Sequence, residues 1–142
     1  MGMRRKGREV AIQTLYSTEF LDNDFKLLPP EGLLKILEEV AADKDILPDS
    51  QIFEFASDLV LNVLKHVAPI DKKIKAHSTN WSFDRIAKLD VGVLRVAVYE
   101  LMFTETAPPI IMNEAIEIAK KYCSESSGKF INGVLNAIAK EK

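Results

Sequence analysis

Apolar residues recur at intervals of three and four along nearly the whole chain, and this spacing restricts the possible fold more than any other feature of the sequence. Near the start, Ile12 and Leu15 belong to one such stripe, which is typical of a helix. The Val-rich stretch 90–103 could also form a strand, but Arg95 and Glu100 break the alternation that a strand requires, and its length favours a helix. No strand pair, repeat or low-complexity tract is visible. The sequence therefore predicts an all-α fold with about seven helices.

Capping residues and prolines divide this pattern into separate helices. The first is predicted over residues 4–21, and either Asp49 or Ser50 can cap the third, whose apolar residues run from Ile52 to Leu64. Asp90 is the expected cap of the Val-rich helix, which the pair Pro108-Pro109 is expected to end. The remaining helical segments are predicted over 33–40, 70–76, 82–89 with Ser82 as cap, 113–122, and from Ser126 or Ser127 to near the end.

The length of 142 residues suits one domain, or two small helical halves that share a core. A polar stretch at 77–80 predicts a division of the single domain 1–142 into an N-terminal half, 1–78, and a C-terminal half, 79–142. With 47% hydrophobic and 28% charged residues, the chain is expected to be globular rather than disordered.

The composition also predicts where the protein works. No stretch approaches the roughly 18 uninterrupted apolar residues of a membrane span, and the start lacks the apolar region of a secretory signal. The single cysteine, Cys123, cannot form an internal disulfide, which fits a reducing compartment. We therefore expect a cytoplasmic protein with no membrane partner.

Residues that could perform catalysis or bind a metal do not cluster in the sequence. His66 and His77 are isolated, and there is no cysteine pair, H-E-x-x-H, P-loop or G-x-G-x-x-G motif. Cys123 has no histidine near it, so a structural thiol is favoured over a nucleophile. The sequence predicts a protein that is not an enzyme, with no catalytic residue, metal or cofactor.

Four cations, Arg4, Arg5, Lys6 and Arg8, crowd the first eight residues although the formal net charge is −2. We call residues 4–8 the basic arm; it is either a solvated leader or a contact for a polyanion. On a helical wheel Arg4 and Arg8 share a face and continue the first apolar stripe, so we expect them to project into water beyond the core. Gly7 weakens a helix by roughly 1 kcal/mol, which suggests an arm that becomes ordered only on contact. Single-stranded RNA would fit, since each neutralised phosphate releases counterions.

Several segments, in this order, are similar to the NusB family of bacterial transcription antitermination factors: the basic arm with REVAIQTLY, then NWSFDRIAKLDVGVLRVAVYEL, NEAIEIAKKY and GKFINGVLNAI. The resemblance spans most of the chain and implies two small perpendicular helical bundles. It also implies a non-enzymatic factor that binds boxA-type single-stranded RNA of ribosomal leader transcripts together with the ribosomal protein NusE. Such factors act in an antitermination complex with RNA polymerase. Some relatives self-associate through the RNA-binding face, so a homodimer is left open.

Two further groups of residues are candidates for RNA binding. The resemblance places Gln13 and Tyr16 among positions that face RNA, although Tyr16 lies in the apolar stripe and could instead fill the core. The second group is SSGKF, at the start of the last helix, where free N–H groups and Lys129 would attract phosphate. Phe130 could stack on a base or anchor the core, and Lys120 would broaden the basic surface.

For the protein partner, the resemblance points to Asp90, which matches an acidic position where the family meets the basic NusE. A cap can keep one oxygen exposed, so both roles are compatible. Gly133 is expected to permit close packing of helices. The polar residues expected to be structural are Trp81, Arg95, Glu100, Asn113 and Glu114.

The RNA-binding prediction requires the basic arm and the start of the last helix to come together on one surface. Two other functions compete with it. One is a structural interaction module in ribosome assembly, with no RNA preference. The other is an accessory domain of an RNA methyltransferase, since NusB-like modules also precede such enzymes, but the sequence shows no cofactor-binding half.

Overall fold

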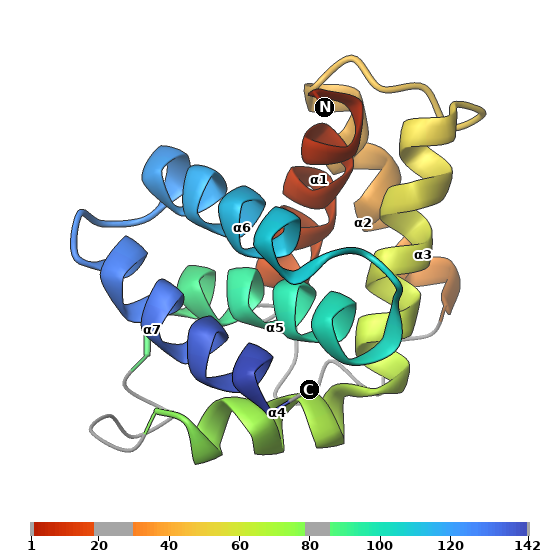
Figure 1. The fold of residues 1–142 in the computed structure, drawn as a ribbon. Coiled ribbons are helices and arrows are strands. Elements are labelled where there is room, and N and C mark those ends of the chain that lie inside the picture. The colour runs from red at the N-terminus through yellow and green to blue at the C-terminus, as the bar shows by residue number, and fades with distance from the viewer. Residues whose placement is uncertain (1, 19–29, 79–85, 142) are drawn as a thin grey trace. The chain divides into compact units, whose positions relative to one another are not determined.

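The computed structural model describes residues 2–18, 30–78 and 86–141, and these ranges contain seven α-helices and no strand (Figure 1). The all-α prediction is confirmed. None of the described helices is long and apolar enough to cross a membrane. The helices are α1 Gly2–Thr18, α2 Pro30–Asp43, α3 Gln51–Lys65, α4 Val67–Ala76, α5 Lys88–Phe103, α6 Pro108–Tyr122 and α7 Ser127–Lys140.

The chain divides into two compact units, Met1–Leu64 and Lys65–Lys142. The sequence places the division after residue 78, whereas α4 belongs with the second unit. The reason is that α4 packs against α5. Arg95 of α5 donates to both carboxylate oxygens of Asp71 in α4, each at 2.9 Å, so a largely buried ion pair also joins these two helices.

In the first unit, α1 packs against α2 and buries the predicted stripe, including Ile12 and Leu15. The helix continues in the N-terminal direction as far as Gly2, and its predicted end at Leu21 lies outside the described residues. Ser50 is the residue that caps α3, because its Oγ accepts from the Phe53 N–H at 3.2 Å. This hydrogen bond decides between the two caps that the sequence left open.

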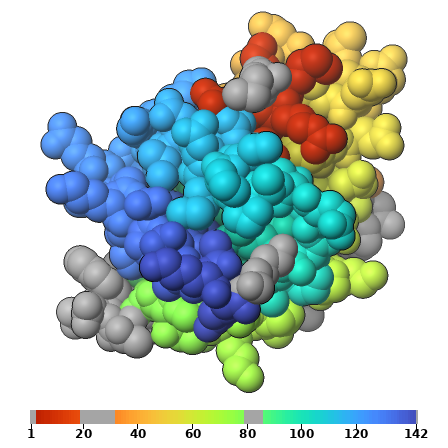
Figure 2. All heavy atoms as spheres, viewed as in Figure 1, coloured from red at the N-terminus to blue at the C-terminus, as the bar shows by residue number. Residues whose placement is uncertain are grey.

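In the second unit, α5 contacts α4, α6 and α7 (Figure 1). Residues 90–98 are all buried, so α5 is covered on several sides rather than along one stripe. This burial explains its Val-rich, strand-like composition, since a helix that is apolar all round needs no solvated face. The helices α6 and α7 pack against each other and form part of the surface in Figure 2.

Several predicted helix boundaries differ from the structure. Asp90 is not a cap, because α5 begins two residues earlier, at Lys88, after Ala87. Residues 86 and 87 are not helical, which contradicts the end of the predicted helix 82–89; Ser82 lies outside the described residues. Pro108 and Pro109 do not end α5 but begin α6. The first turn of a helix tolerates proline because its N–H groups have no partner within the helix.

Candidate nucleic-acid interface

The basic arm lies within the first two turns of α1, and an aromatic ring from α3 lies against it. The guanidinium carbon of Arg4 lies 4.7 Å from the centre of the Phe55 ring, and that of Arg8 lies 5.5 Å from it. Both distances fall within the range of cation–π contacts. Arg8 is only 4% exposed, so the prediction that it projects into water is wrong. Phe55 extends the packed region beyond the end of the apolar stripe.

Gly7 lets that ring approach the helix. A Cβ atom at this position would lie 2.6 Å from Cδ2 of Phe55, which is closer than carbon atoms pack. The interpretation of Gly7 as a source of flexibility is therefore wrong: its small size permits close packing against α3. The arm is helical in the structure as part of α1.

The remaining side chains of α1 that the sequence singled out are partly or wholly accessible. Arg4 and Lys6 are exposed, and Arg5 and Gln13 are half-buried. Tyr16 is 36% exposed, so it does not fill the core. The first unit thus offers two exposed cations, an amide and an aromatic ring along one helix.

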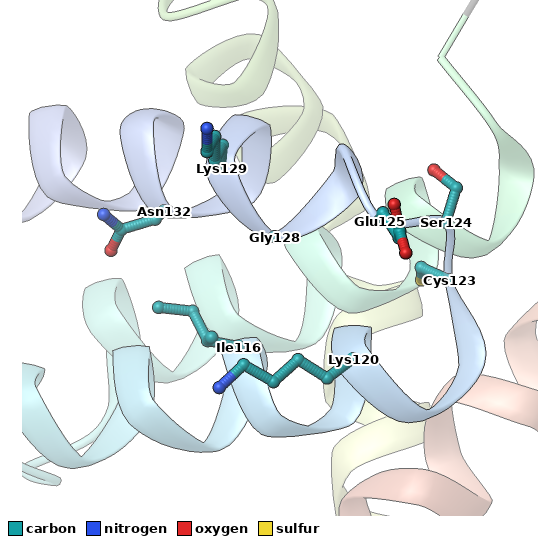
Figure 3. A pocket seen from close by; sticks show the side chains of 8 residues that line it. All are labelled: Ile116, Lys120, Cys123, Ser124, Glu125, Gly128, Lys129 and Asn132. Carbon is teal, nitrogen blue, oxygen red and sulfur yellow. The ribbon is translucent and has the colours of Figure 1, made fainter.

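The second candidate region surrounds the α6–α7 turn, which we define as residues 123–126. One side of this turn borders a pocket of about 430 Å³ (Figure 3). Ile116 and Lys120 of α6 and Lys129 of α7 line it, and Glu125 of the turn closes one end. Both lysines are exposed, and Lys120 Nζ lies 3.2 Å from Glu117 Oε2. The pocket therefore combines two cations with an apolar floor.

The other side of the turn borders a second pocket, of about 190 Å³. Phe130 lines this pocket together with Ile86 and Ala87, which precede α5. Phe130 is half-buried, so its ring is neither a fully buried anchor nor a freely exposed side chain. The α6–α7 turn thus lies between a pocket with lysines and a pocket with an aromatic ring.

Asp90 connects α5 to this turn. Only 8% of the residue is exposed, and the Ser127 hydroxyl donates to its carboxylate, 2.8 Å from Oδ2 and 3.0 Å from Oδ1. The same carboxylate lies close enough to Cys123 to affect the pKa of its thiol. Burial, together with the neighbouring carboxylate of Asp90, raises the pKa of Cys123 to about 12. A thiol with this pKa is protonated at neutral pH, which favours the structural role predicted for it.

The other polar residues named from the sequence have mixed outcomes. Arg95, Glu100 and Glu114 are buried as structural groups, whereas Asn113 is exposed and Trp81 lies outside the described residues. Gly133 does not permit close packing, because a Cβ atom there would meet nothing within 4 Å. Its position faces open solvent.

The two histidines are separate in the structure as they are in the sequence. His66 stacks on Phe103 with the ring centres 4.2 Å apart, and His77 Nε2 lies 3.0 Å from Glu141 Oε2. Across the described ranges, no group of three or more His, Cys, Asp or Glu side chains could hold a metal ion.

Two positions that the sequence did not indicate organise the candidate site. Phe55 looks like one more apolar residue of α3, and only its contact with the arm distinguishes it. The sequence predicts Ser127 as a residue at the start of a helix, not as a partner of Asp90. No spacing rule connects positions 90 and 127, so only the packing of α5 against α7 reveals this pair.

The fold and these two regions define an all-helical protein of two units, each with cations beside an aromatic ring. The NusB family profile matches residues 5–140, so the chain belongs to the NusB family, as the sequence motifs indicated. It is 43% identical to the transcription antitermination protein NusB of Geotalea daltonii, over 98% of this chain and 95% of that protein.

Two solved structures are similar to the whole chain. A structure of T. maritima NusB has a TM-score of 0.81 and 36% identity, covering 97% of this chain and 91% of that one. A crystal structure of the antitermination factors NusB and NusE in complex with dsRNA has a TM-score of 0.83 and 31% identity, covering 100% and 99%. These similarities confirm the family and the fold that the sequence predicted.

Proposed function

We propose that this protein is a non-enzymatic antitermination factor of bacterial transcription that binds boxA-type single-stranded RNA together with NusE. The observation that carries the proposal is the α6–α7 turn, which has lysines in a pocket on one side and an aromatic ring in a pocket on the other. Such a pair of pockets would bind the two parts of a nucleotide at different places, the phosphate beside the lysines and the base against the ring. Membership of the NusB family supports the same function.

Phosphate would bind on the lysine side of the turn. Lys129 lies in the first turn of α7, where free N–H groups and the helix dipole also favour an anion. Lys120 would contribute after exchanging its contact with Glu117 for one with RNA. Glu125 lines the same pocket and would oppose an anion there, which limits the affinity of the site.

A base would bind on the other side, against the ring of Phe130. Stacking on an aromatic side chain is worth about 1–3 kcal/mol per base. The half-buried ring has one portion held by the protein and another available to a ligand. This arrangement holds the ring in place before RNA arrives.

The first unit would supply a further set of contacts to the same strand. Arg4 and Lys6 offer exposed charge to the phosphates, while Gln13 and Tyr16 offer an amide and a ring to the bases. Arg5 is half-buried and Arg8 is buried, so these two residues would add positive charge beneath the RNA-facing surface. That the two units present these residues on one surface stays a prediction.

NusE, RNA polymerase and a second copy of this chain are the proposed protein partners. A similar structure contains NusB and NusE with dsRNA, which supports a joint complex for this chain. The contact between Asp90 and NusE also stays a prediction, although the burial of Asp90 leaves little of its carboxylate for a partner. Bacterial transcription takes place in the cytoplasm, so we place the protein there.

A titration with three RNAs at one salt concentration tests the proposal. The RNAs are a single-stranded boxA sequence, a scrambled sequence of the same composition, and the boxA duplex, each with and without NusE. We expect the tightest binding to single-stranded boxA and a further increase when NusE is present. Equal affinity for boxA and scrambled RNA would instead favour a structural interaction module, and preference for the duplex would contradict recognition of a single strand.

A further inference from the structure

One buried carboxylate lies at both ends of the α6–α7 turn. Cys123 directly follows the last residue of α6, and Ser127 is the first residue of α7. Ser127 donates a hydrogen bond to Asp90, which projects from the first turn of α5, and the same carboxylate raises the pKa of Cys123. A third helix therefore fixes the point where α7 begins and neighbours the point where α6 ends.

The serine hydroxyls extend this connection through the turn in a definite direction. A hydroxyl has one proton to donate, and Ser127 gives its proton to Asp90. Ser124 Oγ lies 2.9 Å from Ser127 Oγ, so Ser124 must be the donor in that pair. Ser126 Oγ, 3.3 Å from Ser124 Oγ, is then the donor to Ser124. The chain of hydrogen bonds runs from Ser126 through Ser124 and Ser127 to Asp90.

The hydrogen bond between Ser127 and Asp90 is buried, whereas Ser124 and Ser126 are exposed, so this bond is the part most sensitive to the loss of a partner. Ser127 is 4% exposed and Asp90 is 8% exposed, so water would replace a missing partner poorly. A buried polar group left without a partner destabilises the protein, because its lost hydrogen bond is not replaced. The turn would relieve that cost by shifting, and a shift would move the two pockets that it separates.

We propose that Asp90 is a positioning residue of the RNA site, acting through Ser127 and Ser124. It does not touch the RNA: it fixes the turn so that Lys129 stays on the phosphate side and Phe130 on the base side. The inference rests on the proposed function. It differs from a direct contact of Asp90 with NusE, because a positioning role depends on an acceptor oxygen, whereas attraction of a basic partner depends on the negative charge.

Four variants separate these roles: Asp90→Ala, Asp90→Asn, Ser127→Ala, and the double variant Asp90→Ala/Ser127→Ala. RNA affinity and NusE association are measured for each, at a temperature where melting curves show that the variant is folded. We expect Asp90→Ala and Ser127→Ala each to weaken boxA binding about tenfold, and the double variant to be no weaker than the worse single variant, since both remove one connection. Asp90→Asn keeps an acceptor oxygen and should retain most of the affinity.

Cys123 provides a readout that does not depend on RNA. The carboxylate of Asp90 helps to raise the pKa of Cys123, so Asp90→Asn and Asp90→Ala should lower that pKa and speed alkylation by iodoacetamide at pH 8. Ser127→Ala leaves the carboxylate beside the thiol and should not speed alkylation to the same extent. The control for a lost charge is Asp58→Asn, an exposed residue of α3 that lies in the other unit.

Several results would overturn the inference. If both Asp90 variants reduce NusE association equally while RNA binding is unchanged, Asp90 is a partner contact. If Ser127→Ala binds RNA as the wild type does, or if the two single effects add in the double variant, the connection does not position the site. If Asp90→Ala does not fold, the RNA affinities of Ser127→Ala and Ser124→Ala test the inference without it. A wild-type protein that does not distinguish boxA from scrambled RNA would contradict the proposed function instead.

Discussion

The basic arm and the α6–α7 turn both place cations beside an aromatic ring, but different forces hold them. In the arm, Arg4 and Arg8 lie over Phe55, and Gly7 leaves room for the ring. At the turn, Lys129 and Phe130 depend on a backbone that is fixed by hydrogen bonds to a buried carboxylate. The first arrangement is held by packing and the second by polar contacts.

The difference predicts how each region responds to mutation. Packing contacts are many and individually weak. A substitution in the arm should therefore change the free energy of unfolding in proportion to the side-chain volume that it adds or removes. Buried hydrogen bonds are few, and the loss of one leaves a partner unsatisfied. The following substitutions test this contrast, in order of decreasing expected effect.

Phe55→Ala should have the largest effect, because it removes the ring that contacts both arginines. Phe55 is half-buried, so we expect a loss of about 2–3 kcal/mol in the free energy of unfolding, below the 3–5 kcal/mol typical of a fully buried ring. RNA affinity should fall as well. The control is Phe53→Ala, a half-buried neighbour on α3: equal losses of RNA affinity in both variants would show that Phe55 has no particular role in holding the arm.

Phe130→Ala should weaken RNA binding by about 1–3 kcal/mol if the ring stacks on a base. Its melting temperature should change much less than that of Phe55→Ala. RNA affinity by titration and melting by circular dichroism check both statements. Phe103→Ala serves as the control, since Phe103 is an exposed aromatic residue of the same unit and lines neither pocket at the turn. A large drop in melting temperature with Phe130→Ala would identify the ring as a core residue.

Neutralising Arg4 and Lys6 to glutamine should lower the slope of log affinity against log salt by roughly 1.4, from about 0.7 for each phosphate contact on a single strand. These two residues are the exposed cations of the basic arm. Arg8 is buried, so Arg8→Gln is expected to reduce stability more than the slope. The control is the exposed pair Lys65 and Lys72, also changed to glutamine, which lowers the net charge by the same amount. If this control lowers the slope equally, the basic arm has no specific role in binding RNA.

The two glycines Gly7 and Gly133 should respond to alanine with opposite signs. Alanine gains about 1 kcal/mol of helix propensity at either position. At Gly7 the added Cβ would press on Phe55, and overpacking of 1–3 kcal/mol should leave a net loss of about 1 kcal/mol. At Gly133 nothing opposes the gain, so stability should rise by about 0.5–1 kcal/mol. Denaturant unfolding measures both, and stabilisation by Gly7→Ala would refute the close packing of the ring.

Much of the fold was predictable because it depends on local spacing. The stripe of Ile12 and Leu15 requires a helix wherever those residues occur, and Ser50 can cap one because its side chain reaches a nearby N–H. Local rules failed where two interpretations were equally good. Pro108 and Pro109 are compatible with the end of one helix or the start of the next, and Asp90 with a cap or a later position.

The candidate site was predictable only in part. The sequence indicated Lys120, Lys129 and Phe130 by their place near the start of a helix, and the structure places all three around one turn. It did not indicate that Phe55 holds the basic arm, because an apolar residue on a helix is normally a core residue. These roles depend on which helices pack together.

The sequence by itself determined the helical class of the protein, the approximate positions of most helices and the family to which it belongs, since periodicity and motifs are properties of neighbouring residues. The tertiary structure decided which side chains support the cations: Phe55 beneath Arg4 and Arg8, and Asp90 beside Ser127. Contacts between residues that are tens of positions apart depend on how helices pack, and no local pattern in the chain encodes that packing.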